Sequence, residues 1–156
     1  EDGANFAYGK TPAPIGCYSI LLAKLQGEQL EGRPEFAETR RRLSQKIEAA
    51  PTNAGLLSNL AVVDALFGRT EDAISEAKRA VEILPISKDA IDGPWISLNL
   101  AIVYAWTNHP DLAFQTLDKL ATIPHGLFCN YLKLGPYFDP LRGDPRFGNL
   151  LAKVGP

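Results

Sequence analysis

Apolar and polar residues alternate with helical spacing over most of this 156-residue chain. From Thr70 to Leu84 the apolar side chains recur in steps of one, three and four residues, which places them on one face of a helix. No segment keeps up the two-residue alternation that is typical of a strand. The pattern therefore predicts an all-α fold, and the stripe in this segment consists of Ala73, Ile74, Ala77, Ala80, Val81 and Leu84.

Twelve prolines divide the chain into helical segments. Because proline has no amide hydrogen and clashes with the preceding turn, it is found at helix starts and beyond helix ends. Asp144-Pro145 and Asp139-Pro140 each predict an N-cap followed by a helix start. Prolines and periodicity together predict helices over about 15–31, 34–49, 53–67, 70–84, 94–107, 110–121, 126–133 and 145–154.

A six-residue pattern recurs between predicted helices at 32, 68 and 108, which are intervals of 36 and 40 residues. Its first residue, Gly or Asn, adopts the left-handed conformation that ends a helix, and Pro or Thr then opens the next helix with an acid in its first turn. Its last residue, Ala, lets the paired helices approach closely. The pattern predicts three hairpins, about 15–51, 53–85 and 94–124, with an exposed turn residue in each and with Ala37, Ala73 and Ala113 buried.

These marks resemble the tetratricopeptide repeat (TPR) family. The matching residues are Leu60-Ala61, Gly68, Ala73, Ala77, Ala80 and Pro85 in the middle copy, and Leu100-Ala101, Tyr104, Asn108 and Ala113 in the third. The stretch 84–94 and the tail 138–147 are similar to the C-terminal TPR region of large bacterial regulatory proteins. The resemblance implies a right-handed helical-hairpin solenoid of three repeats over 14–124, preceded by an N-terminal extension over 1–13 and followed by a C-terminal helical cap over 125–156.

In the TPR family the first helices of successive repeats line a concave groove that holds a peptide or protein segment. Carried over residue by residue, the resemblance implies peptide-binding positions at Gln26, Ser58, Asn59, Val62, Trp95, Asn99 and Ile102. Asn59 and Asn99 occupy equivalent places, where an amide offers a peptide backbone both a donor and an acceptor; the alternative is that they bond only within the hairpin. Trp95 is either an anchor for a ligand or a cover over the third hairpin's core. TPR proteins that bind a terminal carboxylate have lysines and an arginine at such groove positions. Here these positions are Leu22, Ser58, Trp95 and Leu98, which argues against a terminal carboxylate as ligand.

A search for chemistry finds no GxSxG, HExxH, GxGxxG or phosphate-loop motif and only two histidines. His125 and Cys129 are too few ligands for a zinc site. We therefore expect a non-enzymatic protein without cofactor or metal, whose partner is a protein or peptide. The run Arg40-Arg41-Arg42 is interpreted as a solvated helix face with a Glu38–Arg42 pair. Two alternatives stay open, a helical-repeat nucleic-acid binder, which the net charge of −2 disfavours, and a small hydrolase with an unrecognised site.

The ends of the chain and its apolar runs bear on location. The longest apolar run, 18–23, is far shorter than the roughly 20 residues of a membrane span, so no membrane association is expected. The chain begins at Glu1 with no Met and no signal-peptide pattern. It is interpreted as a piece of a larger protein, cytoplasmic, with an extracytoplasmic location as the alternative. Cys17 and Cys129 are predicted to be unpaired.

Apolar residues crowd the tail over 127–151. Exposing so much apolar surface invites aggregation, so we expect this segment to pack on the third hairpin. A bolder hypothesis places the aromatic side chains of 127–138 in the groove, where they narrow it.

Overall fold

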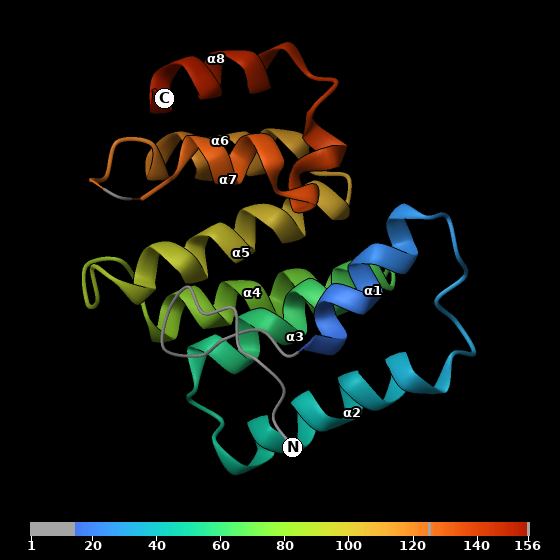
Figure 1. Ribbon diagram of the computed structural model, residues 1–156. Helices are drawn as coiled ribbons and strands as arrows, with labels where there is room; N and C mark the ends of the chain where they lie inside the picture. The colour runs from blue at the N-terminus through green and yellow to red at the C-terminus, as the bar shows by residue number, and fades with distance from the viewer. Residues whose placement is uncertain (1–14, 125, 156) are drawn as a thin grey trace.

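The computed structural model describes residues 15–124 and 126–155, and within these ranges every regular element is a helix (Figure 1). The predicted all-α class is therefore confirmed, while the N-terminal extension 1–13 lies outside the described residues. In chain order the elements are α1 (Ile15–Leu25), α2 (Pro34–Ala49), α3 (Ala54–Leu66), α4 (Thr70–Ile83), α5 (Asp92–Trp106), α6 (Pro110–Leu120), α7 (Cys129–Leu134), the 3-10 helix η1 (Pro136–Leu141) and α8 (Pro145–Val154).

The recurring turn residues have the backbone conformation that the pattern predicts. Gly32, Gly68 and Asn108 have φ angles of 81°, 78° and 61°, and all three are exposed. After α3, the amide of Gly68 donates to the carbonyl of Ala65 and the next amide donates to that of Asp64, so the last carbonyls of the helix are satisfied. The pairs α3–α4 and α5–α6 are therefore tight hairpins, joined by residues 67–69 and 107–109.

The first hairpin differs from the other two. Gly27, with a φ of 73°, ends α1 at Leu25, so the helix is six residues shorter than predicted and a long connection, 26–33, precedes α2. The prediction that Ala37 is buried is wrong, because Phe36 takes the inward position and Ala37 is exposed. Ala73 and Ala113 are buried as predicted. The open first hairpin follows from a second helix-ending glycine upstream of Gly32.

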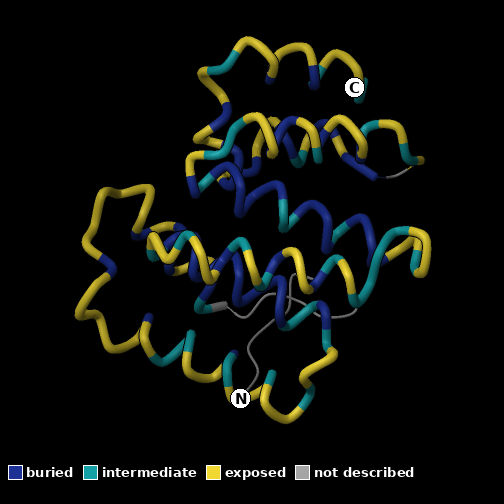
Figure 2. Tube along the Cα trace, turned by 180° about the vertical axis from the view of Figure 1, so that it is seen from behind, coloured by how far each residue is buried: buried dark blue, intermediate teal, exposed yellow. Residues whose placement is uncertain are grey.

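The core is centred on α3 and α5, which pack against each other and against α4 (Figure 2). Both helices are apolar on nearly every side, and most of their residues are buried. By contrast, α2 buries only Phe36 and Leu43, and its other residues are half-buried or exposed. A helix that is apolar all round needs neighbours on all sides, and α3 and α5 find these neighbours in the surrounding helices.

The tail packs on the third hairpin, as its composition predicts. Leu132, Phe138 and Leu141 are almost completely buried, and α8 lies against α6 and α7. Asp144 caps α8 by accepting from the amide of Arg146 at 2.9 Å, so that helix starts as predicted. Asp139 is not an N-cap: it lies inside η1, which begins at Pro136, and it accepts from Arg142 Nε at 2.7 Å.

The two cysteines are both buried and free. Cys17 lies on α1 and Cys129 at the start of α7. The prediction that they are unpaired is confirmed. Burial raises the pKa of the Cys17 thiol to about 12, which keeps it protonated and unreactive at neutral pH.

Candidate functional site

One groove with a volume of about 590 Å³ lies among the described helices. Its floor comes from α3 and α5, and its sides come from α1, from the loop that leads into α5, and from the segment 131–137 of the tail. The volume falls within the range of about 300–1,000 Å³ that is usual for ligand sites. The first helices of the hairpins and the tail therefore all contribute to this groove.

A pair of polar side chains joins the two helices of the floor. Asn99 Nδ2 on α5 donates to Ser58 Oγ on α3 at 3.0 Å, and this hydroxyl donates in turn to the carbonyl of Gly55. Asn59, also in the groove lining, is largely buried. The bond of Asn99 thus links two hairpins, which differs from the within-hairpin bond considered above. It holds the Asn99 amide in a defined position at the groove surface.

The aromatic side chains of Tyr18, Trp95, Tyr131 and Tyr137 line parts of the groove. The ring of Trp95 stacks on Phe128 with centroids 6.4 Å apart, and Tyr131 meets Trp95 edge-on at 5.9 Å. On the other side, Tyr137 meets Tyr18 of α1 edge-on at 6.4 Å. Trp95 both contacts the core and lines the groove, so it fits each of its two interpretations. Of the aromatic side chains that the bolder hypothesis places in the groove, Tyr131 and Tyr137 line it, whereas Phe138 is buried in the core.

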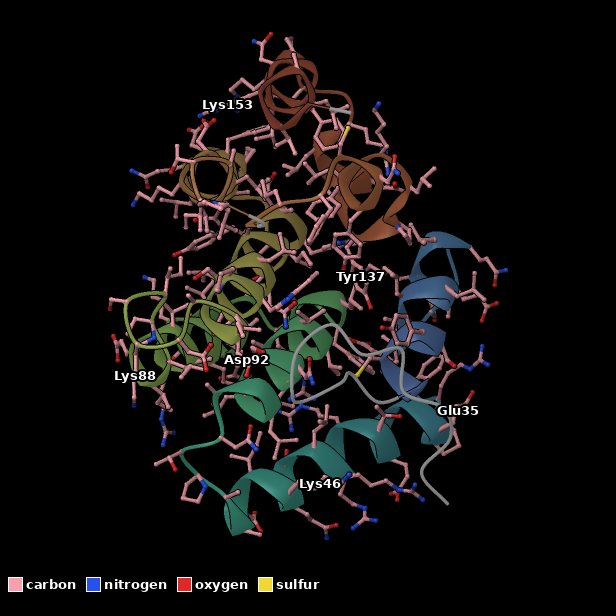
Figure 3. All side chains as sticks on the ribbon, turned by 60° about the vertical axis from the view of Figure 1, so that its left-hand side comes forward. Glu35, Lys46, Lys88, Asp92, Tyr137 and Lys153 are labelled. Carbon is pink, nitrogen blue, oxygen red and sulfur yellow. The ribbon has the colours of Figure 1, made fainter. Side chains whose placement is uncertain are left out.

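Tyr137 also joins the tail to the third hairpin. Its carbonyl accepts from Trp106 Nε1 at 2.9 Å. Burial raises the pKa of Tyr137 and also that of the more exposed Tyr18, so both phenols are neutral at physiological pH. Figure 3 shows Tyr137 between α1 and the helices of the tail. The groove is thus closed on this side by neutral aromatic side chains.

The opposite end of the groove carries acidic side chains where α5 begins. Asp89 Oδ1 accepts from the backbone amides of Ile91 and Asp92, both at 2.9 Å, which fixes the turn into the helix. Asp92, labelled in Figure 3, is largely buried in the groove lining. The neighbouring Lys88 Nζ donates to the carbonyl of Ile83 at 3.1 Å, which ties this cation to the end of α4. Among the described residues that line the groove, these two carboxylates and Lys88 are the charged groups.

Five of the seven side chains assigned to the groove by the resemblance do line it: Ser58, Asn59, Val62, Trp95 and Asn99. Gln26 and Ile102 do not. Gln26 lies just beyond the C-terminal end of α1, which ends at Leu25, and Ile102 is buried in the core. The sequence reasoning missed Tyr18 and Asp92, because their place in the groove depends on long-range packing and not on repeat position, whereas Tyr137 belongs to the tail segment that the bolder hypothesis places there.

The arginines of the basic run on α2 each pair with a nearby carboxylate, Arg41 and Arg42 with the same one. Arg41 and Arg42 both donate to Glu38 at 2.6–2.7 Å, and these hydrogen bonds lower the pKa of Glu38 to about 2. The predicted Glu38–Arg42 pair is therefore confirmed. Arg40, however, turns inward to the buried Asp64, with hydrogen bonds of 2.6 and 2.9 Å. The run presents paired charges and not an open cationic patch.

The described residues contain no group of three or more His, Cys, Asp or Glu side chains placed to hold a metal ion. Within the same ranges, no helix has the length and apolar character needed to cross a membrane. Comparison with family models, curated proteins and solved structures found no match to this chain. Functional inference therefore rests on the geometry of the groove.

Proposed function

We propose that this chain is a non-enzymatic interaction module that binds an extended peptide segment of a protein partner in the groove between α1, α3, α5 and the tail. The recurring left-handed turns at Gly32, Gly68 and Asn108 support a TPR-like arrangement of three hairpins with a helical cap. On the resemblance of the linker and tail, we further propose that the module serves a larger bacterial regulatory protein in the cytoplasm.

The observation that carries the proposal is the mixture of polar and aromatic groups in one preformed groove. An extended backbone presents amide and carbonyl groups that a fixed side-chain amide such as Asn99 can bond. Aromatic walls provide large contact areas at low entropic cost, and such residues dominate binding energy at interfaces. The thiol of Cys17 is protonated, and no histidine lines the groove among the described residues. Binding therefore fits the groove better than acid–base or nucleophilic catalysis.

Selection from a display library of 12-residue peptides on the immobilised chain tests the proposal. Titration calorimetry then compares the tightest peptide on the wild type, on Asn99→Ala and on Thr107→Val. Asn99→Ala removes the hydrogen bond to Ser58, and Thr107→Val, at the C-cap of α5, removes the hydroxyl whose shortest hydrogen bond goes to the carbonyl of Val103, so each should lower the free energy of unfolding by about 1 kcal/mol. Only Asn99 lines the groove.

We expect Asn99→Ala to weaken peptide binding at least fivefold, which corresponds to about 1 kcal/mol, and Thr107→Val to leave the affinity within twofold. Equal affinities for all three proteins, or a library that yields no binding peptide, would contradict the proposal. Salt-dependent binding of single-stranded RNA in a parallel titration would favour the nucleic-acid alternative instead.

A further inference from the structure

We propose that Ser58 fixes the side-chain amide of Asn99 with its oxygen toward the ligand, so that the groove selects peptide segments that present a free backbone N–H at this point. The proposal rests on the peptide-binding function proposed above and names the chemistry that the ligand must offer. In it Ser58 is a positioning residue: only 1% of its surface is exposed, so the fold covers it and Asn99 makes the contact with the ligand.

The single hydrogen of the Ser58 hydroxyl is already used inside α3. Ser58 Oγ donates to the carbonyl oxygen of Gly55 at 3.0 Å, and a carbonyl oxygen can only accept. A serine hydroxyl has one hydrogen, so its remaining bonding capacity is its lone pairs. A group that bonds Ser58 from α5 must therefore be a donor.

This requirement sets the orientation of the Asn99 amide. Its nitrogen, Nδ2, is the donor that Ser58 needs and lies 3.0 Å from Ser58 Oγ. Its oxygen, Oδ1, is on the other side of the same carbon and so points away from Ser58. No donor within residues 15–124 and 126–155 bonds to this oxygen, and Asn99 is half-buried in the groove lining. The floor of the groove therefore presents an oriented acceptor where α3 meets α5.

A backbone N–H is the peptide group that fits an oriented acceptor. An extended backbone carries N–H donors and C=O acceptors, and only the donors can bond Oδ1. Once a ligand covers the floor, water no longer reaches this oxygen, so a ligand without a donor leaves a buried acceptor unpaired. Sites built to bond an N–H or O–H group discriminate strongly against analogues that lack it. Proline and N-methylated residues lack this hydrogen, and we expect the groove to reject them at this one position.

An N-methyl scan of the tightest library peptide tests this selectivity by titration calorimetry. Each analogue carries a methyl group on one backbone nitrogen and lacks that donor. We expect one analogue to bind the wild type about tenfold more weakly than the parent peptide. Its two neighbours should bind within about threefold of the parent, because successive N–H groups of an extended chain point to opposite sides. On Asn99→Ala the tenfold difference should shrink to about threefold or less, since the bulk of the methyl group remains but the acceptor is gone.

Ser58→Ala separates positioning from a purely structural role. Without the hydroxyl, the Asn99 amide can turn either its oxygen or its nitrogen toward the ligand, so the preference for the parent peptide should fall to about threefold. A structural role alone would weaken parent and analogue by the same factor and leave the preference at about tenfold, which would refute the positioning of Asn99 by Ser58. Thr107→Val, which removes a hydrogen bond of α5 at its C-cap, is the control that should keep the full preference.

Asn99→Asp at pH 8 tests the direction of the bond. A carboxylate has nearly the shape of the amide but can only accept, and the Ser58 hydroxyl can turn its hydrogen toward it. We expect this variant to bind the parent peptide within about threefold of the wild type and to keep the preference against the N-methyl analogue. A loss as large as that of Asn99→Ala, in a variant that urea unfolding shows to be folded, would mean that the amide donates to the ligand and would overturn the proposal.

Two small amides distinguish this proposal from the peptide-binding function. N-methylacetamide has an N–H and a C=O group, whereas N,N-dimethylacetamide has only the C=O group. In NMR titrations of the full chain, the first should shift the side-chain amide signals of Asn99, assigned with Asn99→Ala, and the second should not. This result together with a library that yields no peptide would refute peptide binding and leave the oriented acceptor in place. Equal shifts from both amides, no shift from either, or a bound peptide whose N-methyl analogues all bind alike would contradict the oriented acceptor, and the last outcome would leave peptide binding intact.

Discussion

The buried ion pair between Arg40 and Asp64 gives the sharpest test of how α2 is held. Asp64 is completely buried on α3, and Arg40 reaches it from α2 with two hydrogen bonds, at 2.6 Å from Nε and 2.9 Å from Nη2. Arg69 Nε lies 4.0 Å away and supplies the other nearby positive charge. Because α2 buries few apolar side chains, this pair is a large part of what attaches it.

The substitution Arg40→Ala leaves the Asp64 carboxylate buried with one distant cation. Removing one partner of a buried pair costs about 3–5 kcal/mol. The Arg40 side chain is 29% exposed and Arg69 compensates in part, so we expect a loss of about 2–3 kcal/mol. For a chain of this size, the melting temperature should fall by about 4–12 °C.

Arg41→Ala is the matched control on the same helix. Arg41 is 55% exposed and pairs with the partly exposed Glu38, so its removal should change stability by no more than about 0.5 kcal/mol. Urea unfolding followed by circular dichroism at constant pH and salt measures both variants, with unchanged slopes required for comparison. The double variant Arg40→Met/Asp64→Leu should recover most of the loss, because apolar replacements remove the unpaired charge.

A loss for Arg40→Ala within about 0.5 kcal/mol of that for Arg41→Ala would refute the reasoning. It would mean that α2 is held by its apolar contacts and that the carboxylate of Asp64 is satisfied without Arg40. Failure of the double variant to recover stability would instead show that the shape of the pair, and not its charge, supports the α2–α3 contact.

Three further substitution sets give independent tests. Burial, followed by the nearby charge of Asp64, raises the pKa of Glu76 from 4.5 to about 7. The folded state therefore binds more protons than the unfolded state between these pH values, and the free energy of unfolding falls as the pH rises through them. Glu76→Gln should flatten this part of the pH profile of stability, measured by urea unfolding, and should add about 1 kcal/mol at pH 8 after solvent screening. Gly93→Ala should destabilise the start of α5, because a Cβ there would lie 2.7 Å from Ile86 Cα, whereas Gly148→Ala, with open space around it in α8, should raise the melting temperature by a few degrees. Phe138→Ala should cost about 3–5 kcal/mol, and Phe128→Ala, at an exposed ring, about 1 kcal/mol or less by the same unfolding assay.

The repeated hairpins could be predicted from sequence because their signals are local. A glycine or asparagine that accepts a positive φ, followed by a helix-opening residue, specifies the turn without reference to the rest of the chain. Thus Gly68 and Asn108 take the expected conformation, and the alanine five positions later is buried in both hairpins. The same local signal occurs twice near the first turn, at Gly27 and Gly32, and periodicity alone did not show which one ends α1.

The sequence contains an indication of the Arg40–Asp64 pair that was overlooked. Asp64 stands alone among apolar residues in the segment from Leu60 to Phe67, and a charge in the middle of a buried helix requires an opposite charge nearby. That requirement predicts a basic partner from another helix. It does not name Arg40 over Arg41 or Arg42, because the choice depends on which face of α2 meets α3.

Only part of the candidate site could be predicted from the sequence, because the floor and the side walls of the groove arise in different ways. Its floor repeats with the hairpins, so Asn59 and Asn99 could be placed by their equivalent positions. Its walls do not repeat: Tyr18 and Tyr137 meet from opposite ends of the chain. Such a contact depends on how the tail folds back along α5, and no local sequence pattern predicts it.

The contact between Tyr18 and Tyr137 links the groove to the least enclosed part of the fold. α1 is joined to α2 by the long connection 26–33, and its face with Tyr18, Leu22 and Leu25 is exposed. It packs against α2 and α3, and Tyr18 meets the ring of Tyr137 in the tail. A ligand that lies in the groove touches α1 on one side and η1 on the other, so it bridges the same two elements. If a peptide binds there as proposed above, its binding and the docking of α1 should therefore stabilise each other.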